Sequence, residues 1–407
     1  MLKERRNRHF GIVTQVYPPD PAAVGQHLAD VAEELGRRGH RVTVFTADSG
    51  YDNPSQRYAR FERNGNVAVL RLPLASFGKS SISLRLLGGA SLFAQASVLT
   101  ALDFRLTDLL LSTIPHFVGA LGVAMKVIRH LPFHYWLMDL NPDQMVALGK
   151  LRADSRAVKA FDLINRGILR HAKSITTLDE VMARRFSAKS THSPSIDIQP
   201  PWPGQGHTQP VDHSINPFRA RFGLTSRRVV MHAGNHSAVH PLDTFVQAIR
   251  LLGQSSVSYF FVGGGVGKAG IERWVSAEKP PNVTLLPYQP RGQVHSMLCA
   301  ADVHVVAVGN NTVGIVHPSK IYGALAAGRP VLVFGPRESP VARLVTEWNL
   351  GWQVEHGAIA QACSVLKTIE QLPEEELHVL KARALQVCAS QFSRKRGIEQ
   401  FCNRLLS

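Results

Sequence analysis

The stretch HPSKIYGALAAGRPVLVF, from His317 to Phe334, decides the fold. A short polar opening precedes a run of helix-forming residues that stops at Gly328, and the apolar run after it is typical of a buried strand. The pattern therefore predicts a loop, a helix and a strand, in that order. Backbone N–H groups in the first turn of such a helix lack partners within it. With Ser319 and Lys320 beside them, they suit an anion such as a diphosphate.

The length of 407 residues exceeds that of a usual single domain and predicts two domains, each with its own core. Residues 1–9 are basic, but the apolar run 10–16 that follows is too short for a signal peptide or a membrane span. The apolar region 84–102 is interrupted by a charge and by glycines, so we expect a buried or surface-lying helix there. Four cysteines without metal-ligand or redox spacing indicate reduced thiols and a cytoplasmic protein: Cys299, Cys363, Cys388 and Cys402.

The formal net charge of +16 is spread over the whole chain. Residues 1–200 hold 26 Lys and Arg against 17 Asp and Glu, and the remainder holds 20 against 13. The sequence contains no basic arm interleaved with aromatic residues and no nucleic-acid-binding motif, so nucleic acid is not expected as a partner. An anionic substrate or an anionic membrane surface fits this charge better.

Strands and helices alternate in the first half of the chain. Apolar runs at 10–16 and 41–46 flank an amphipathic helix at 26–38 that ends at Gly39, which predicts a strand–helix–strand unit with parallel strands. This pattern is typical of a doubly wound α/β domain, for which we expect the limits 1–200. Further strands are expected at 67–72, 108–112, 133–137 and, as the last of them, 173–177, with helices near 83–102 and 117–129.

Proline, glycine, histidine and asparagine dominate residues 199–217, so we expect no regular element there and place an interdomain linker at 201–217. Two doubly wound parallel-sheet domains, 1–200 and 218–407, would then face each other across a cleft at the carboxyl ends of their strands, where such sheets bind ligands. The last helical pattern, 390–406, is compatible with packing on the second domain or with crossing back to the first. In the second half we expect strands at 228–233, 257–262, 283–286 and 303–308 and helices at 242–252 and 293–300.

Gly265 to Gly270 match the glycine spacing of dinucleotide-binding loops. The match does not follow the first strand of its domain, and no acidic residue stands about twenty positions on to bind a ribose. A nicotinamide cofactor is therefore disfavoured, and a turn that lets the backbone approach a ligand or another loop is the better interpretation. The sequence also contains no Walker, zinc, nucleophile-elbow or kinase motif.

Polar side chains at strand-to-loop transitions are candidates for ligand contact. Asn235, His236 and His240 follow the first strand of the second half, although His240 would serve equally with Asp243 as a helix cap. Asp139 follows a strand of the first half and is either a group that orients or deprotonates a hydroxyl or a cap of the next turn. Similarly, the lysine at 320 is either a phosphate ligand or a solvated surface residue.

Together these segments resemble the nucleotide-sugar-dependent glycosyltransferases of the GT-B fold, family 4, and within it a polysaccharide-biosynthesis branch like the colanic acid transferases. The order and spacing of the motifs carry the resemblance over nearly the whole chain. It implies two Rossmann-like domains, the first for an acceptor and the second for a nucleoside diphosphate sugar that we expect to be uridine-linked. The matching segments are 16–20, 25, 28–29, 34–35, 39–44, 136–142, 200–202, 234–240, 261–265, 286–290, 300–304 and 318–320.

The resemblance also implies which residues bind each substrate. Tyr288 and Gln289 would lie by the base, and Ser319 and Lys320 by the diphosphate. The first domain would bind the acceptor through Gly25, Asp139 and Asn141, with Asp139 and Lys320 as catalytic residues. The full set of donor-binding candidates is Gly234, Asn235, His236, His240, Gly263, Gly264, Tyr288, Gln289, His317, Pro318, Ser319, Lys320 and Ile321.

The sequence departs from the family pattern at the donor site. Many family 4 enzymes carry two glutamates around this last helix, and the corresponding positions here are Ile315 and Gly323. The Arg and Lys that commonly bind the diphosphate after the first strand of the second domain are also missing. We therefore expect His317, Ser319 and Lys320 to bind the donor instead.

The expected reaction is a retaining, hexosyltransferase-like transfer to a lipid-linked or saccharide acceptor in cell-surface polysaccharide biosynthesis. Neither a metal nor another cofactor is expected, because a helix start and Lys320 would stabilise the charge that develops on the diphosphate. The basic segment 150–173 is either a helix that rests on the inner face of the cytoplasmic membrane or a packed helix with a solvated basic side. Two other functions stay open: a nucleotide-sugar epimerase on the same fold, and a non-catalytic nucleotide-sugar-binding or scaffold protein.

Overall fold

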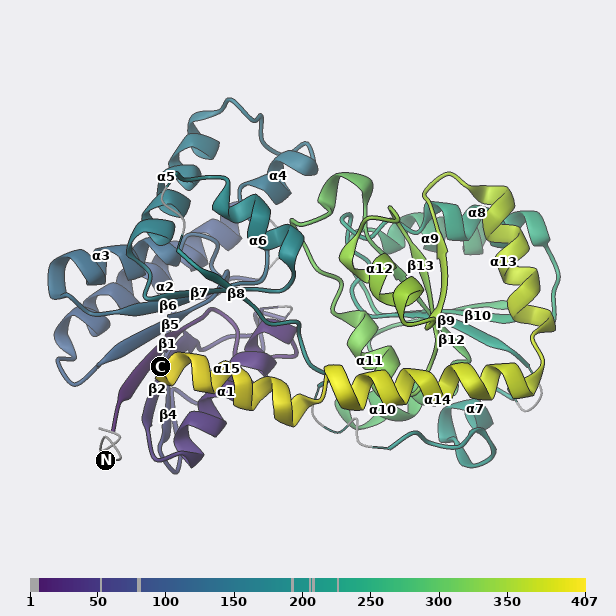
Figure 1. Cartoon of the computed structure of the whole chain (residues 1–407), viewed down its shortest axis with the longest axis horizontal. Coiled ribbons are helices and arrows are strands. Elements are labelled where there is room, and N and C mark those ends of the chain that lie inside the picture. The colour runs from purple at the N-terminus through teal and green to yellow at the C-terminus, as the bar shows by residue number, and fades with distance from the viewer. Residues whose placement is uncertain are drawn as a thin grey trace. The chain divides into compact units, whose positions relative to one another are not determined.

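The computed structural model describes residues 7–51, 53–78, 82–191, 194–204, 206, 209–224 and 227–407. The chain forms two compact units, which Figure 1 shows with their elements labelled. The N-terminal unit comprises Met1–Pro200 together with Lys395–Ser407, and the C-terminal unit comprises Pro201–Arg394. The final helix, α15 (Arg394–Leu406), therefore crosses back to the N-terminal unit, and residues 201–217 belong to the C-terminal unit.

The N-terminal unit is built on an eight-stranded sheet in the order β3-β4-β2-β1-β5-β6-β7-β8. All neighbouring strands are parallel except the pair β3 and β4. The central strand, HFGIV, is buried along its whole length, as expected for a parallel strand covered by helices on both faces. The strands are β1 (His9–Val13), β2 (Arg41–Ala47), β3 (Phe61–Asn64), β4 (Val67–Leu72), β5 (Asp108–Leu111), β6 (Phe133–Leu137), β7 (Ser174–Thr177) and β8 (Ile196–Ile198).

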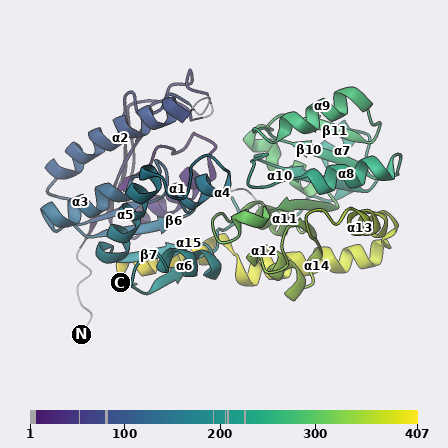
Figure 2. The same cartoon turned by 90° about the horizontal axis from the view of Figure 1, so that it is seen from above.

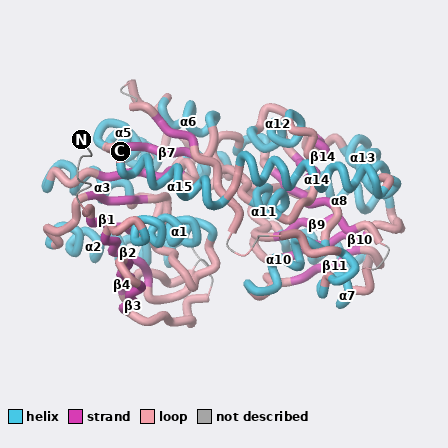
Figure 3. Tube along the Cα trace, turned by 60° about the horizontal axis from the view of Figure 1, so that its bottom comes forward, coloured by secondary structure: helices cyan, strands magenta, loops and turns pink. Residues whose placement is uncertain are grey.

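Helices cover both faces of this sheet (Figure 3). The final helix packs by the ring of Phe401, whose centroid lies 4.1 Å from that of Trp136, and by Cys402, whose Sγ lies 3.9 Å from the carbonyl oxygen of Val31. The helices are α1 (Ala23–Arg37), α2 (Ile82–Leu102), α3 (Gly119–Arg129), α4 (Asp143–Ala147), α5 (Arg156–His171), α6 (Glu180–Ser187) and α15.

Two edge strands of the N-terminal sheet were not predicted from the sequence. The prediction that strand 173–177 ends this half is wrong, because β8 pairs in parallel with β7 outside it. The other edge strand, β3, has the sequence FERN with all four side chains exposed, so it carries no apolar alternation by which it can be recognised.

The C-terminal unit contains an all-parallel six-stranded sheet in the order β11-β10-β9-β12-β13-β14. Adjacent residues of one strand enter different cores: Val230 belongs to the cluster around Phe245 and Leu366, whereas Val229 belongs to the cluster around Phe218 and Met297. Because successive side chains point to opposite faces, this division shows a sheet packed on both sides. The strands are β9 (Val229–Ala233), β10 (Ser258–Val262), β11 (Val283–Leu286), β12 (Val303–Ala307), β13 (Val331–Phe334) and β14 (Gly351–Val354).

Eight α-helices lie in the described part of the C-terminal unit. They are α7 (Pro217–Arg221), α8 (Asp243–Leu252), α9 (Lys268–Glu278), α10 (Arg291–Ala300), α11 (Lys320–Ala326), α12 (Pro340–Glu347), α13 (Ile359–Gln371) and α14 (Glu374–Gln391). The expectation of no regular element within 199–217 is wrong at two points, since His213–Ile215 form a 3₁₀ turn capped by Asp212 and α7 begins at Pro217. Residues 317–334 follow the prediction, with α11 leading into β13.

Candidate functional site

The loops that follow β9 and β12 lie side by side at the carboxyl edge of the C-terminal sheet. These two strands are neighbours, and the chain leaves them toward different faces, which makes this a topological switch point where parallel sheets bind ligands. The backbone N–H of Gly309 donates to the carbonyl oxygen of Val239 over 3.0 Å, and Thr312 Oγ1 donates to the same oxygen over 3.3 Å. Residues 234–242 and 308–319 thus form one surface.

Lys320 reaches from the start of α11 to the end of β9. Gly234 there has a φ of 121°, and a Cβ built on it would lie 2.8 Å from Lys320 Cε. A side chain at 234 would therefore displace the lysine, so glycine is needed both for its backbone conformation and for this close approach. Among the described residues, Lys320 Nζ has no hydrogen-bond or ion-pair partner, and its burial lowers its pKa to about 8. Lys320 is thus partly buried rather than fully solvated.

Three histidines surround this lysine, and all three are neutral at pH 7. Burial lowers the pKa of His236 to about 4, and burial together with Lys320 lowers the pKa values of His232 and His240 well below the usual value. The rings of His232 and His236 meet edge to face with centroids 4.7 Å apart. Within the described chain, the Nε2 atoms of His232 and His236 are both buried without a hydrogen-bond partner. The lysine, rather than the histidines, therefore supplies the positive charge here.

The capping alternative for His240 and Asp243 does not hold. Helix α8 has Leu242 at its N-cap, and no side chain caps it. His240 lies instead at the switch point, beside the carbonyl of Ala307 and close enough to Lys320 for that cation to lower its pKa.

The glycines after β10 allow a second close approach between loops. Gly263 has a φ of 119°, and a Cβ on it would overlap the carbonyl oxygen of Gly234. A Cβ on Gly265 would likewise overlap the side-chain oxygen of Asn235. This geometry matches the interpretation of the glycine-rich segment as a turn at which one backbone approaches another loop. Lys268, the first residue of α9, joins the loop after β10 to the end of β11. Its amine donates to the carbonyl oxygens of Gly263 and Leu286, each over 2.6 Å.

Tyr288 and Gln289 lie beyond β11 on the same edge. Tyr288 is 50% exposed, and its Oη donates to the carbonyl oxygen of Gly264 over 3.3 Å. A Cβ on Gly264 would lie 3.1 Å from the tyrosine ring, so the ring packs closely against the glycine backbone. Gln289 turns back to donate to the carbonyl oxygen of Pro287 over 2.9 Å. The exposed ring of Tyr288 is available for stacking with a ligand, whereas the side-chain amide of Gln289 already donates a hydrogen bond within the protein.

The remaining donor-site candidates occupy the turn before α11. His317 Nε2 and Tyr322 Oη are 2.7 Å apart, and Ile321 is fully buried, so the side chain of Ile321 is not available to a ligand. Ser319 is the N-cap of α11 without a side-chain cap bond, and Pro318 is buried beside it. The helix has only seven residues, so its dipole is short and the lysine carries the attraction for an anion.

In the N-terminal unit, Asp139 and Asn141 follow β6 at the carboxyl edge. Burial raises the pKa of Asp139 to about 6, and its carboxylate has no hydrogen-bond or ion-pair partner in the described part of the chain. It caps no helix, because α4 has Pro142 at its N-cap and no side-chain cap bond. Asn141 Nδ2 lies 3.2 Å from Nδ1 of His116, while Asn141 Oδ1 is buried without a partner among the described residues. Gly25, within α1, allows close packing, since a Cβ on it would lie 2.8 Å from the carbonyl oxygen of Val16.

Sequence reasoning missed two residues at these edges. His232 lies inside β9 and reads as an ordinary strand residue, yet its ring faces His236. His116 follows β5, and burial lowers its pKa to about 4, with Arg85 Nη2 3.0 Å from its Nε2. The signal for His116 was its place just beyond a strand, which is the same signal that identified Asp139. In the described residues, no group of three His, Cys, Asp or Glu side chains is placed to hold a metal ion.

Comparisons with known proteins agree with this architecture. In sequence, the chain is 25% identical over 333 residues to WcaI of Escherichia coli (strain K12), named as a colanic acid biosynthesis glycosyl transferase, covering 77% of this chain and 79% of the relative. It is 22% identical over 293 residues to WbjE of Pseudomonas aeruginosa, also named as a glycosyltransferase, covering 72% and 70%. Residues 22–202 match the family described as glycosyl transferase 4-like domain, and residues 215–386 match glycosyl transferases group 1.

Solved structures show the same fold. Sucrose-phosphate synthase from Thermosynechococcus elongatus superposes with a TM-score of 0.80 at 14% identity and covers 98% of each chain. Anabaena Alr3699/HepE in complex with UDP-glucose superposes with a TM-score of 0.71 at 13% identity, covering 98% of this chain and 99% of that one. Both sheets, their strand order and the two family matches lead to one conclusion: the chain belongs to the GT-B glycosyltransferases, with a glycosyl transferase 4-like domain followed by a group 1 domain.

Proposed function

We propose that the protein transfers a sugar from a UDP-linked donor to a lipid-linked or saccharide acceptor in the synthesis of a cell-surface polysaccharide. The observation that carries this proposal is the partly buried, unpartnered amine of Lys320 at the switch point of the C-terminal sheet. A buried cation without a partner is costly, and a diphosphate would supply the missing counter-charge. The names of WcaI and of the UDP-glucose complex of Anabaena HepE support the polysaccharide and the uridine nucleotide.

In the proposed reaction, the bond between the sugar's anomeric carbon and the diphosphate breaks, and the acceptor oxygen forms a bond to that carbon with retention of configuration. Negative charge grows on the diphosphate in the transition state. In this proposal Lys320 stabilises that charge and no metal ion is required, and the neutral histidines beside the lysine add no further charge. Nucleotide base binding is assigned to the exposed ring of Tyr288 over Gly264.

The acceptor is assigned to the N-terminal unit, where Asp139 accepts or orients the hydroxyl proton. An unpaired carboxylate with a pKa near 6 suits this role, because at pH 7 it is mostly ionised and still basic enough to accept a hydrogen bond strongly. We place the protein in the cytoplasm, at the inner face of the membrane that carries a lipid-linked acceptor.

The test is to incubate the purified protein with individual UDP-sugars, with and without short saccharide acceptors, and to identify the products by mass spectrometry and NMR. Transfer with retained anomeric configuration and release of UDP is the expected result. Isomerisation of the donor in the absence of acceptor would favour an epimerase instead. If calorimetry detects no binding of UDP or any UDP-sugar, the proposal is wrong and a non-catalytic scaffold role is favoured.

A further inference from the structure

We propose that the outer side of helices α2, α3 and α5 docks on an anionic membrane surface. The three helices form one layer on the N-terminal sheet, with α3 in contact with both of the others (Figure 2). The proposal rests on the proposed function only for its purpose, which is access to a lipid-linked acceptor. Its test is membrane binding, which requires no sugar transfer.

Helix α2 is apolar on both its inner and its outer side. Its inner side is formed by Gly88, Leu92, Ala96 and Thr100, which recur every four residues and are buried against the unit. The stretch Ser83–Leu102 is long and apolar enough to cross a membrane by length and composition, and 28% of its most apolar window is buried. Because one side of α2 packs against the N-terminal unit, we infer that the helix lies on a membrane rather than across it.

Apolar side chains are exposed at the C-terminal ends of both α2 and α3. Leu102, Phe104 and Ile128 are 69%, 79% and 71% exposed, and Val98 of α2 and Val127 of α3 are exposed as well. Arg129 holds the two helix ends together by donating to the carbonyl oxygens of Thr100 and Asp103, and its guanidinium lies 4.5 Å from the centre of the Phe104 ring. We call Val98, Leu102, Phe104, Val127 and Ile128 the apolar cluster.

Charge identifies the partner of this cluster. The sequences of the three helices contain seven Lys and Arg residues against a single acidic residue, Asp162, which is already paired with Lys189 at 2.8 Å. On α5, Lys159, Leu163, Arg166 and Arg170 recur at intervals of three and four residues, so they share one side of the helix, and all four are exposed. Within the described residues, Lys159, Arg166 and Arg170 have no ion-pair partner. We call Lys159, Arg166 and Arg170 the basic stripe.

The burial of segment 150–173 shows which side of α5 packs on the core and which side is exposed. Ile168 and Leu169 are buried and Phe161 and Ile164 are partly buried, so the apolar residues of α5 pack on the core, and the helix presents its basic side outward. In the proposed docking, α2 and α3 therefore make the apolar contact with the membrane, and α5 makes the electrostatic contact. A bilayer with anionic headgroups matches both parts, because apolar side chains enter the interface while each basic group gains about 1 kcal/mol from the surface potential.

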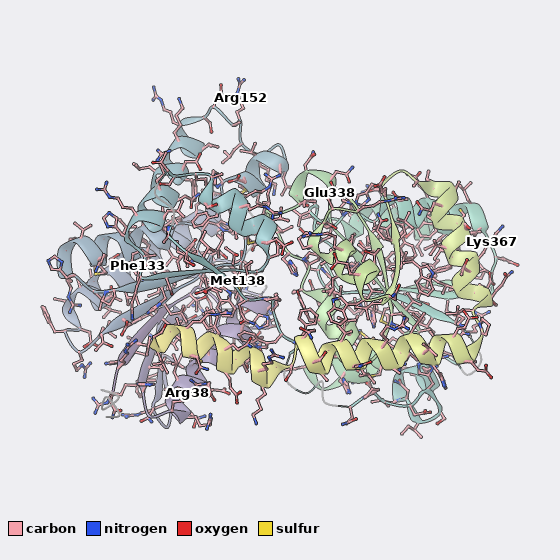
Figure 4. The ribbon with its side chains drawn as sticks, in the orientation of Figure 1. Arg38, Phe133, Met138, Arg152, Glu338 and Lys367 are labelled. Atoms are coloured by element: carbon pink, nitrogen blue, oxygen red, sulfur yellow. The ribbon has the colours of Figure 1, made fainter. Side chains whose placement is uncertain are left out.

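The experiment uses the full-length protein with phosphatidylcholine vesicles, with and without phosphatidylglycerol, in a flotation assay. We expect binding only to the vesicles that contain phosphatidylglycerol, and we expect added salt to weaken it. Lys159→Glu with Arg166→Glu should weaken binding by at least about 25-fold, taking roughly fivefold per removed charge. Leu102→Gln with Ile128→Gln should weaken it as well. The controls are Leu251→Gln and Lys367→Glu, which change an exposed apolar and an exposed basic side chain of the C-terminal unit (Figure 4).

The outcomes separate this proposal from the proposed function. A protein that transfers sugar to a soluble acceptor but stays out of the vesicle fraction overturns the docking proposal alone. Vesicle binding without transfer overturns only the enzymatic function. Equal binding by wild type and both double variants also overturns the docking surface. If sedimentation shows a dimer that Leu102→Gln with Ile128→Gln converts to a monomer, the apolar cluster is an interface between two copies, and the proposal is wrong.

Discussion

The side chain of Lys320 lies directly over the Cα of Gly234, so that a Cβ at position 234 would be 2.8 Å from Lys320 Cε. The two residues come from neighbouring strand-to-helix connections, and each makes the other's conformation possible. The glycine provides the space and the positive φ, and the lysine places an unpartnered amine at the switch point. In the proposed function, this pair is the diphosphate site.

Replacing Lys320 with methionine should abolish detectable binding of UDP while stabilising the fold. The stem of the side chain is kept, and the charge that burial disfavours is removed. The pKa of Lys320 is about 8 in the folded protein, so the folded state binds fewer protons than the unfolded state between about pH 8 and 10.5. The cost of the charged amine is thus fully present below pH 8, and the variant should gain about 1–3 kcal/mol at pH 7. Calorimetry with UDP and urea unfolding measure the two effects, and a destabilised variant that still binds UDP would contradict both.

Gly234→Ala should weaken UDP binding at least about tenfold, because the added Cβ displaces the lysine and strains a φ of 121°. Gly292→Ala is the matched control, since Gly292 has no heavy atom within 4 Å of its Cβ position and no positive φ. Calorimetry on both variants checks this expectation. Wild-type affinity in Gly234→Ala would remove this pair of residues from the donor site.

Asp139 should produce the acid limb of the pH–rate profile. Burial raises its pKa to about 6, so kcat/KM is expected to rise between about pH 5 and 7 as the carboxylate ionises. Because the folded pKa is raised, ionisation costs stability as the pH increases through 6. Asp139→Asn should therefore lose most of the activity and gain about 1–3 kcal/mol of stability at pH 8, but not at pH 4. An unchanged profile in Asp139→Asn would exclude Asp139 as the titrating group.

Lys268 is expected to be a positioning residue for the base site. Its amine donates to the carbonyl oxygens of Gly263 and Leu286, which precede the loops that hold Gly264 and Tyr288. Lys268→Met leaves both carbonyls without this donor and should raise KM for the UDP-sugar severalfold with little change in kcat, since the chemistry is elsewhere. Lys279→Met, at an exposed lysine of the same segment, is the control. A fall in kcat at unchanged KM would contradict the positioning role.

Periodicity predicted the central strands well because they are buried and apolar on both faces. The limits of β4 and β6 agree with the sequence prediction to the residue, and so do those of β11, an edge strand whose sequence, VTLL, is still mostly apolar. The edge strands β3, β8 and β14 were missed. All four side chains of β3 are exposed, β8 has only three residues, and β14 is mostly half-buried, so none of them carries a clear apolar pattern. The return of α15 to the N-terminal unit has no local signal either, since it depends on the contact between Phe401 and Trp136 across 265 positions of sequence.

The candidate site was predicted by residue type and place but not by environment. Lys320 was identified beside an expected helix start, whereas its burial and its approach to Gly234 depend on two loops 86 positions apart in sequence. His232 was missed because a histidine within an apolar strand carries no functional pattern. Lys268 was read as part of a glycine-rich turn, although it begins α9 and uses its amine to join two loops.

A crystal structure of the full-length protein with UDP tests the central claim most directly. We predict that oxygen atoms of the diphosphate lie within about 3 Å of Lys320 Nζ, beside Gly234 and between the loops that follow β9 and β12. A diphosphate bound elsewhere, or one that leaves the Lys320 amine without a contact, would contradict the account.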